Sequence, residues 1–297
     1  MGRVRGGGQN PPSGVVINYM LKAKATEVTL EFLDSAGKPV RKISSKPDPK
    51  AVAAPVPSDD DEGPRGPAGP TLAPTNAGWN RFIWDMRYPE ASSFPGMIYW
   101  AGFTRGPAAV PGNYTVKLTV DGKSFTQPFA INKDPRTQGT VQDLQKQLDL
   151  SLQIRDKVTQ ANDTVIAIRD IRKQVDDLVA RSANLKDAGK VIEAGKKLSK
   201  ELGEVEQELY QVKNQSSQDP LNFPIKLNNK LAALLGVVQN SDTGPTAQSN
   251  QVFEDLATKV NGHLRKYEGL LKNDLPSFNK LVRDTMVPAV ILKTQTP

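Results

Sequence analysis

The sequence contains no cysteine, a single histidine and no long apolar run, and each shortage excludes a class of protein. Without cysteine, the 297-residue chain can form neither disulfides nor thiolate metal sites. Because His263 is the only histidine, most catalytic triads and transition-metal sites are excluded, and we expect no metal or other cofactor. No apolar run approaches the ~18 residues of a membrane span, so no transmembrane helix is predicted.

A concentrated basic surface is also missing, although the formal net charge is +7. Residues 1–136 carry 17 Lys and Arg against 12 Asp and Glu, and the remainder carries 22 against 20. No basic cluster is interleaved with stacking aromatic residues, so we do not expect nucleic-acid binding. Residues 1–14 are rich in glycine, with positive charge but no apolar core, so they do not form a signal peptide. We interpret them as a leading segment that continues from an upstream region.

The motifs of common enzymes are absent as well. The chain has no G-x-S-x-G elbow, no H-E-x-x-H zinc motif and no phosphate-binding loop. Glycoside hydrolysis needs two carboxylates across a cleft, and Asp85 and Glu90 are the acids nearest to the aromatic residues. Asp85 directly follows Trp84, which suggests the end of a strand or a turn. We therefore predict no catalytic residue, and the sequence favours a non-enzymatic role without settling it.

What the sequence does contain is a sharp change of composition near residue 136. Seventeen of the 23 prolines precede this point, and the long helical periodicities all follow it. We predict an α+β multidomain protein, with an immunoglobulin-like β-sandwich over residues 15–136 and an antiparallel α-helical bundle over residues 137–297.

Alternating apolar residues predict the strands of the first half. The pattern occurs in residues 15–21, 28–32, 40–43, 82–86, 114–120 and 123–131. Between the last two segments, Asp121 and Gly122 form the strongest short hairpin signal, because a type I′ turn needs positive φ at both central positions. Residues 46–75 interrupt this pattern with eight prolines, an acidic run at 59–62 and almost no large apolar side chain. We expect a disordered loop there, and we interpret its acidic run as a solvated linker rather than a calcium site.

Apolar residues at intervals of three, four and seven predict the helices of the second half. We expect one long helix over about 140–183, which begins with the hydroxyl of Thr140 and an acid three residues later. Further helices are expected over 188–212, 225–239, 248–272 and 276–286. The charged faces carry both signs, as on a solvated exterior, although the long helix could instead offer a face to a partner.

Two aromatic segments are the candidates for function. In residues 77–89, a strand would direct Phe82, Trp84 and Met86 to one face, which predicts a sandwich core. The second segment has no periodicity, and its aromatic and apolar residues are Phe94, Met97, Tyr99, Trp100 and Phe103. These five residues either pack under a neighbouring element or form an interaction surface. As an alternative, Trp79, Tyr99 and Trp100 could stack against a carbohydrate.

Three ordered stretches resemble a known module. "EVTLEFLDSAGKPVRKI", "AGWNRFIWDMRYP" and "VPGNYTVKLTVDGK" are similar to the immunoglobulin-like module typified by the flagellar hook-capping protein. The chain as a whole resembles the C-terminal region of secreted bacterial proteins with a sortilin-like β-propeller, the "glycosyl hydrolase, BNR repeat" type. That resemblance rests on "QNPPSGVVINYML", "NRFIWDMRYPEASSFPGMIYWAGFTRGP" and "QDPLNFPIKLNNKLAALLGVVQNSDTGPTAQS".

The resemblance implies a secreted, periplasmic or cell-surface bacterial protein with an upstream propeller. The propeller repeats are absent from these 297 residues, so the resemblance assigns no catalytic residue to them. We therefore expect a non-catalytic accessory or scaffolding region that contacts the propeller or another protein subunit. The alternative is a carbohydrate-binding or glycan-processing module.

Overall fold

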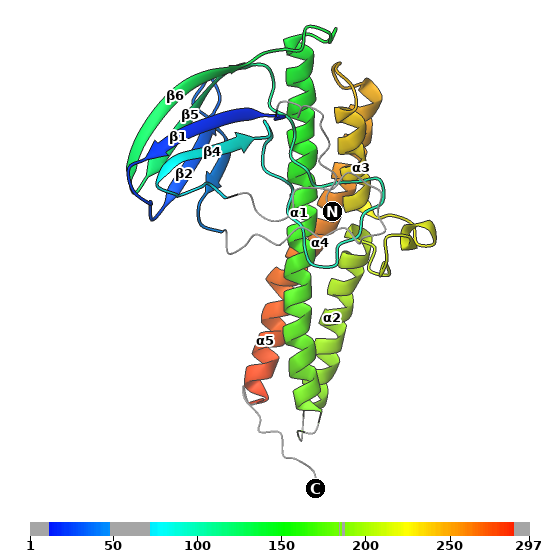
Figure 1. Ribbon diagram of the computed structural model, residues 1–297. Helices are drawn as coiled ribbons and strands as arrows, with labels where there is room; N and C mark the ends of the chain where they lie inside the picture. The colour runs from blue at the N-terminus through cyan, green and yellow to red at the C-terminus, as the bar shows by residue number, and fades with distance from the viewer. Residues whose placement is uncertain (1–11, 48–71, 184, 186–187, 288–297) are drawn as a thin grey trace, which may run out of the picture. The chain divides into compact units, whose positions relative to one another are not determined.

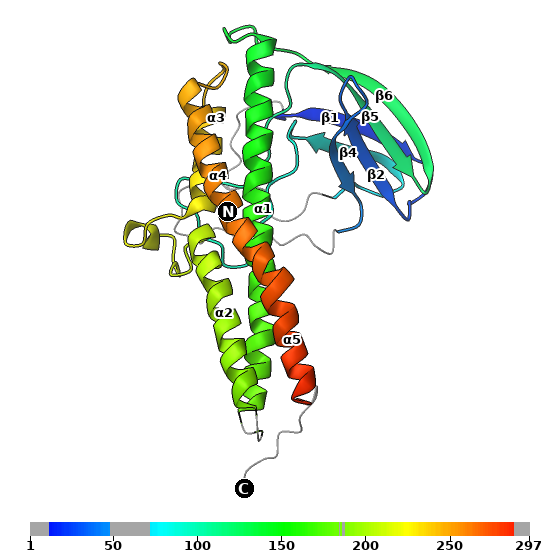
Figure 2. The same cartoon turned by 180° about the vertical axis from the view of Figure 1, so that it is seen from behind.

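The chain forms two compact units, shown in Figures 1 and 2. The computed structural model describes residues 12–47, 72–183, 185 and 188–287. The sheet unit comprises residues up to Glu90 together with 106–148, and the helical unit comprises 91–105 together with the chain from Asp149 onward. This division corrects the boundaries expected from the sequence, because the aromatic segment 91–105 belongs to the helical unit and not to the β-rich half.

The sheet unit contains two antiparallel sheets, which together with the helices make the protein α+β. A pair of strands, β1 (Val15–Leu21) and β4 (Gly78–Trp84), forms the smaller sheet. The larger sheet has the order β3-β2-β5-β6, with β2 (Val28–Leu33), β3 (Pro39–Ser44), β5 (Gly112–Val120) and β6 (Lys123–Ile131). Figure 1 shows both sheets, with β1 and β4 side by side.

The turns between the strands follow from residues suited to positive φ. Asp121 has a φ of 45° and Gly122 a φ of 86°, so the β5–β6 hairpin has the backbone that the Asp-Gly signal predicts. Before β3, the Asp34 carboxylate accepts hydrogen bonds from the backbone N–H groups of Ala36 and Lys38, while Gly37 adopts a φ of 77°. The predicted Asp-Gly turn is therefore confirmed.

One aromatic cluster joins the two sheets of this unit. The Trp84 ring from β4 stacks on Phe32 from β2 at 4.3 Å between centroids. Tyr114 and Phe129 from β5 and β6 meet the Trp84 ring edge-on at 6.1 and 6.2 Å. Such aromatic pairs add to the stabilisation from burial. The prediction that Trp84 belongs to the core is confirmed, since this side chain is almost fully buried.

The chain leaves β4 through a tight turn at Asp85. The Asp85 carboxylate accepts a hydrogen bond of 3.2 Å from the Arg87 N–H, and Met86 between them has a φ of 58°. Trp84 Nε1 donates to the Arg87 carbonyl at 3.1 Å, which fixes the same turn to the core. The interpretation of Asp85 as a strand-end residue is confirmed. Met86 lies beyond the strand, so only Phe82 and Trp84 of the predicted stripe occupy β4.

Most of the expected loop 46–75, including the acidic run at 59–62, lies outside the described residues. Its C-terminal end is held in the sheet unit. The Ala73 N–H donates to the Ser44 carbonyl at 3.1 Å, and the Thr75 carbonyl accepts from the Ala25 N–H at 3.0 Å. The Tyr19 hydroxyl donates to the Pro74 carbonyl at 2.5 Å, and burial raises the pKa of Tyr19 to about 12. Residues 73–75 are therefore held to β1, to β3 and to the segment before β2, and Ala73 belongs to the buried core.

The described helices agree with the predicted ranges to within a few residues. They are α1 (Val141–Ser182), α2 (Gly189–Leu209), α3 (Leu227–Gln239), α4 (Ala247–Gly269) and α5 (Leu275–Asp284), with a single 3₁₀ turn at Asp219–Leu221. In Figures 1 and 2, α2 and α5 lie beside the C-terminal half of α1. Among the described helices, none combines the length and the hydropathy that a bilayer-spanning segment needs.

Helix α1 begins as the sequence predicts. Thr140 Oγ1 accepts from the Asp143 N–H at 3.1 Å, and the Asp143 carboxylate accepts from the Thr140 N–H at 3.1 Å. This reciprocal pair satisfies two N–H groups that the first turn leaves without intrahelical partners. The hydrogen bonds from Thr140 lower the pKa of Asp143.

A π-helical turn, Leu270–Asp274, joins α4 to α5 without a break in the helical run. Pro276 in the first turn of α5 has no N–H to offer the preceding turn, and its ring would clash with a carbonyl in a regular α-helix. A wider turn relieves that clash by adding one residue. Beyond it, Phe278 is buried and lies against Gly195 of α2, where an added Cβ would come within 3.2 Å of the ring.

Candidate functional site

The aromatic segment 91–105 lies beside three almost fully buried asparagines, Asn162 of α1 and Asn228 and Asn229 of α3, and Asn162 and Asn229 bond to it directly. Asn162 Oδ1 accepts from the Tyr99 hydroxyl at 3.1 Å and from Asn228 Nδ2 at 2.9 Å. Asn162 Nδ2 donates to the Ser92 carbonyl at 2.6 Å. One side chain of α1 therefore binds both the segment and α3.

Asn229 forms a second tie to the segment by pairing with the backbone of Trp100. Its Oδ1 accepts from the Trp100 N–H and its Nδ2 donates to the Trp100 carbonyl, both at 2.8 Å. Earlier in the segment, the Ser92 N–H donates to Thr159 Oγ1 of α1 at 3.3 Å, and the Ser92 hydroxyl donates to the Thr159 carbonyl at 3.2 Å. These side chains give an irregular, partly buried backbone the hydrogen-bond partners that a strand or helix would have supplied.

An ionic and aromatic cluster holds the start of the segment. The Phe94 ring meets Tyr210 edge-on at 5.0 Å, and the Arg169 guanidinium lies 4.6 Å from the Phe94 ring centroid. Arg169 and Arg172 of α1 both bond to the buried Glu206 carboxylate of α2, at 2.6 and 2.8 Å. Such pairing offsets part of the cost of removing a carboxylate from water. The cluster links α1, α2 and the segment.

The end of the segment packs against α3 through small residues. A Cβ added to Gly102 would lie 2.9 Å from Asn229 Nδ2 and 3.0 Å from the Ala232 Cβ. The Phe103 ring lies over Gly236, where an added Cβ would come within 3.3 Å of two ring atoms. Glycine and alanine at these positions allow the segment to approach the helix closely.

This packing divides the five residues predicted as an interaction surface. Phe94 and Met97 are buried in the core of the helical unit, so that surface must exclude them. Tyr99 is half-buried, with its hydroxyl bonded to Asn162, and burial raises its pKa. Trp100 and Phe103 are 41% and 44% exposed. Only these two rings offer substantial apolar area to a partner.

A second apolar surface covers the outer face of the β1–β4 sheet. Residues directly opposite each other form three rows: Val16 with Ile83, Asn18 with Arg81, and Met20 with Trp79. All six side chains are exposed; Trp79 is 76% exposed and Met20 57%. In the central row, Arg81 Nε donates to Asn18 Oδ1 at 3.2 Å. We call these six residues the outer face.

The outer face contains a shallow hollow of about 400 Å³ lined by Asn18, Trp79, Asn80 and Arg81. The alternative expected from the sequence is that Trp79, Tyr99 and Trp100 stack against a carbohydrate. Trp79 belongs to the sheet unit, whereas Tyr99 and Trp100 belong to the helical unit. The structure therefore places them in separate units, and the Tyr99 hydroxyl is already bonded within its own unit.

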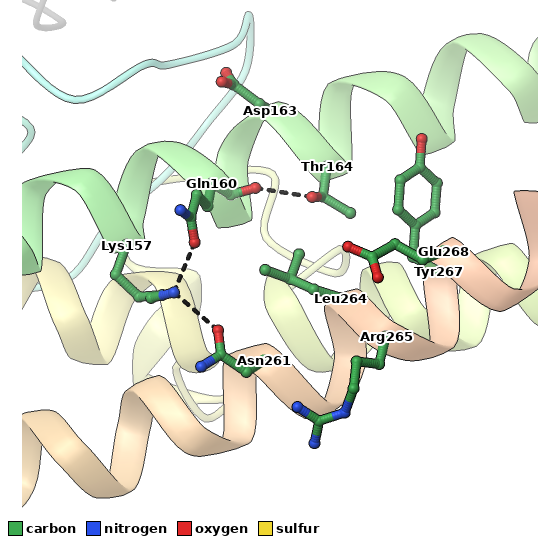
Figure 3. Close-up of a pocket in the computed structure, with 9 residues that line it drawn as sticks. All are labelled: Lys157, Gln160, Asp163, Thr164, Asn261, Leu264, Arg265, Tyr267 and Glu268. Carbon is green, nitrogen blue, oxygen red and sulfur yellow. Dashed lines mark hydrogen bonds between the residues drawn. The ribbon is translucent and has the colours of Figure 1, made fainter.

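A larger hollow of about 580 Å³ lies between α1 and α4 (Figure 3). Lys157 Nζ donates to Gln160 Oε1 at 2.6 Å and to Asn261 Oδ1 at 2.8 Å. Partial burial lowers the pKa of Lys157. Both partners are neutral amides, and Asp163 and Arg265 lie at the margins in Figure 3. We interpret this arrangement as a polar tie between two helices.

The remaining candidates for catalysis are dispersed. Glu90 forms an ion pair with Arg41 at 3.1 Å, and Asp85 holds the turn after β4. His263 is half-buried on α4. Among the described residues, no group of three or more His, Cys, Asp or Glu side chains could hold a metal ion. Because none of these groups meets another in a hollow, the described side chains do not form a recognisable catalytic arrangement.

The buried asparagines are the residues that sequence reasoning missed. A signal existed, because Asn162 follows Val158 by four positions and precedes Val165 by three, in phase with the apolar stripe. Asn228 likewise precedes Leu231 and Leu235 by three and seven positions. A polar side chain in phase with a buried stripe must find an internal hydrogen-bond partner, so it predicts a polar tie inside the core.

Comparison of the chain with protein-family models, with curated proteins and with solved structures gave no match.

Proposed function

We propose that this protein is a non-catalytic accessory region that binds a partner protein through the outer face of its β1–β4 sheet. One observation carries the proposal: four large apolar side chains, Val16, Met20, Trp79 and Ile83, are exposed together in two cross-strand rows. Tryptophan and methionine are enriched at protein interfaces, and a clustered apolar face on a sheet is costly to leave in water.

The fold that we propose supports this role. In the described part of the chain, six antiparallel strands form two sheets around one aromatic core, which is consistent with an immunoglobulin-like sandwich, and the described helices are consistent with an antiparallel bundle. The resemblance to regions that follow β-propellers in secreted bacterial proteins favours a secreted or cell-envelope setting. In that setting the partner would be the propeller or another subunit.

A site-specific crosslinking experiment tests the proposal. The photoreactive residue p-benzoylphenylalanine replaces Trp79 in one sample and Phe125 in a matched control. Phe125 is an exposed aromatic residue on β6, 61% exposed, in the same unit. We expect a discrete protein adduct from position 79 that disappears with Met20→Ser or Ile83→Ser, and no such adduct from position 125. Equal adducts from both positions, or none from position 79, would show that the outer face is not the interface.

A second candidate function is glycan binding, favoured by the exposed Trp79 ring beside the polar groups of Asn18 and Arg81 in the hollow. A sugar would stack on the indole and form hydrogen bonds with the neighbouring amide and guanidinium. Titration with soluble oligosaccharides should then shift the tryptophan fluorescence of the protein but not of Trp79→Phe. A fluorescence change that survives this substitution would contradict stacking on Trp79.

A further inference from the structure

The four edges of the two sheets differ in how they are protected. An exposed strand edge presents unpaired N–H and C=O groups, and proteins commonly protect such edges with charge or proline. Strand β3 carries Pro39, Arg41 and Lys42; β6 carries Lys123 and Pro128; and β4 carries Arg81. Strand β1, with the sequence VVINYML, has neither a charged residue nor a proline.

Strand β1 pairs with β4 along seven residues, and no described strand pairs with its other edge. In an antiparallel pair, the backbone groups of successive residues point alternately toward the partner strand and away from it. About half of the polar backbone groups of β1 therefore point away from β4. Val15 and Ile17, on the inner face of the same strand, are only half-buried, so a neighbouring strand would cover them further.

Next to this backbone edge, the outer face presents a defined pattern of side chains. An added strand would continue the three rows described above, with apolar positions next to Val16 and Met20 and a polar position next to Asn18. Because Asn18 Oδ1 already accepts from Arg81, its amide N–H groups are left to donate. The Arg81 guanidinium, whose Nε is bonded to Asn18 Oδ1, brings a positive charge next to this position. The polar position therefore favours a carboxylate.

We propose that the free edge of β1 takes up an extended strand from a partner protein, one that carries an acidic residue between two apolar residues at alternate positions. Backbone hydrogen bonds along the edge would supply affinity, and the three rows would supply specificity. This inference rests on the proposed function, because it specifies how a partner engages the same face.

A fluorescein-labelled peptide, TVTDTFT, tests the inference by fluorescence anisotropy. Its valine, aspartate and phenylalanine match the three rows, and its threonines keep it soluble. We expect the aspartate peptide to bind about three- to five-fold more tightly than the lysine analogue TVTKTFT, as for one exposed charge contact with the Arg81 guanidinium that lies on Asn18. Arg81→Glu should reverse this preference, whereas the matched charge change Lys123→Glu on β6 should leave it intact. If Arg81→Glu still prefers the aspartate peptide, or if Lys123→Glu also loses the preference, the inference is wrong.

Backbone methylation separates strand addition from simple contact with the outer face. Methylation of the valine, aspartate and phenylalanine nitrogens blocks one edge of the peptide, and methylation of the last three threonine nitrogens blocks the other. Strand addition predicts that one isomer loses about tenfold or more in affinity, because several backbone hydrogen bonds are lost, while the other still binds. Equal behaviour of the two isomers would overturn strand addition.

Two further outcomes keep this inference distinct from the proposed function. If both isomers bind equally and Trp79→Ser abolishes binding, the outer face is an interface but the edge is not used. If sedimentation shows that the protein dimerises and that Trp79→Ser makes it monomeric, a second copy occupies the face. That result would overturn the inference of a partner strand.

Discussion

The two aromatic segments, Gly78–Trp84 in the sheet unit and 91–105 in the helical unit, achieve burial by different means. In β4, alternation alone decides which ring is inside, so Trp84 is buried and Trp79 is exposed five residues earlier. Segment 91–105 has no period, and the asparagines of α1 and α3 decide which of its residues are held. In a strand the position determines burial, whereas in an irregular segment the available hydrogen-bond partners determine it.

The largest expected effect distinguishes the two tryptophans of β4. Trp84→Ala removes a buried ring that stacks on Phe32, and we expect it to lower the free energy of unfolding by about 3–5 kcal/mol. Trp79→Ala, at an exposed position of the same strand, should change that free energy by less than about 0.5 kcal/mol. Urea unfolding monitored by circular dichroism measures both. Similar losses of unfolding free energy in the two variants would show that alternation does not determine burial in β4.

The next effect tests the asparagine ties of segment 91–105. Asn162→Ala leaves the Tyr99 hydroxyl, the Asn228 amide and the Ser92 carbonyl without this partner, at a cost of about 2–3 kcal/mol. It should also expose the segment to limited proteolysis. Asn240→Ala, at an exposed position after α3, is the matched control. If the two variants are equally stable and equally resistant, the asparagine does not hold the segment.

A smaller effect concerns the close approach of the segment to α3. Gly102→Ala would bring a methyl group against Asn229 and Ala232, and we expect a loss of about 1–3 kcal/mol. Gly262→Ala in α4 meets no atom within 4 Å and should instead stabilise its helix by about 0.5–1 kcal/mol. Thermal unfolding of both variants provides the measurement. A stabilising Gly102→Ala would mean that the segment does not need to approach α3 so closely.

The smallest effect concerns pH at the start of α1. Because Thr140 holds the pKa of Asp143 below its ordinary value of 3.8, the cap stabilises the folded state above that pH. The stabilisation is lost as the pH falls through the lower, folded-state pKa. Asp143→Asn should therefore reduce the fall in melting temperature between neutral pH and about pH 2. An acid-dependent fall identical to that of the unsubstituted protein would show that the cap contributes nothing.

The local features were predictable from the sequence because local interactions determine them. The Asp-Gly turn, the alternation in β4, the Thr140 cap and the ranges of the helices each depend on residues only a few positions apart. The face of α1 was predicted less accurately. Both Val141 and Ile154 are apolar residues of this helix, yet Val141 is exposed whereas Ile154 is fully buried.

The place of segment 91–105 could not be predicted in the same way. Its ties join residues separated by 63 positions, as in Tyr99 to Asn162, and by 129 positions, as in Trp100 to Asn229. Composition and periodicity are local measures, so they assigned the segment to the β-rich half. They also presented all five of its apolar residues as equivalent, although only Trp100 and Phe103 remain substantially exposed.

The π turn at Leu270–Asp274 has a consequence for how the sequence can change. Each residue of an α-helix advances the side-chain direction by about 100°, so the added residue rotates everything after it by that amount. Deletion of one residue from this turn would restore a regular helix but would direct Phe278 away from Gly195. Pro276 would then occupy an ordinary helical turn. The helical run from α4 to α5 thus tolerates substitution better than it tolerates a change of length.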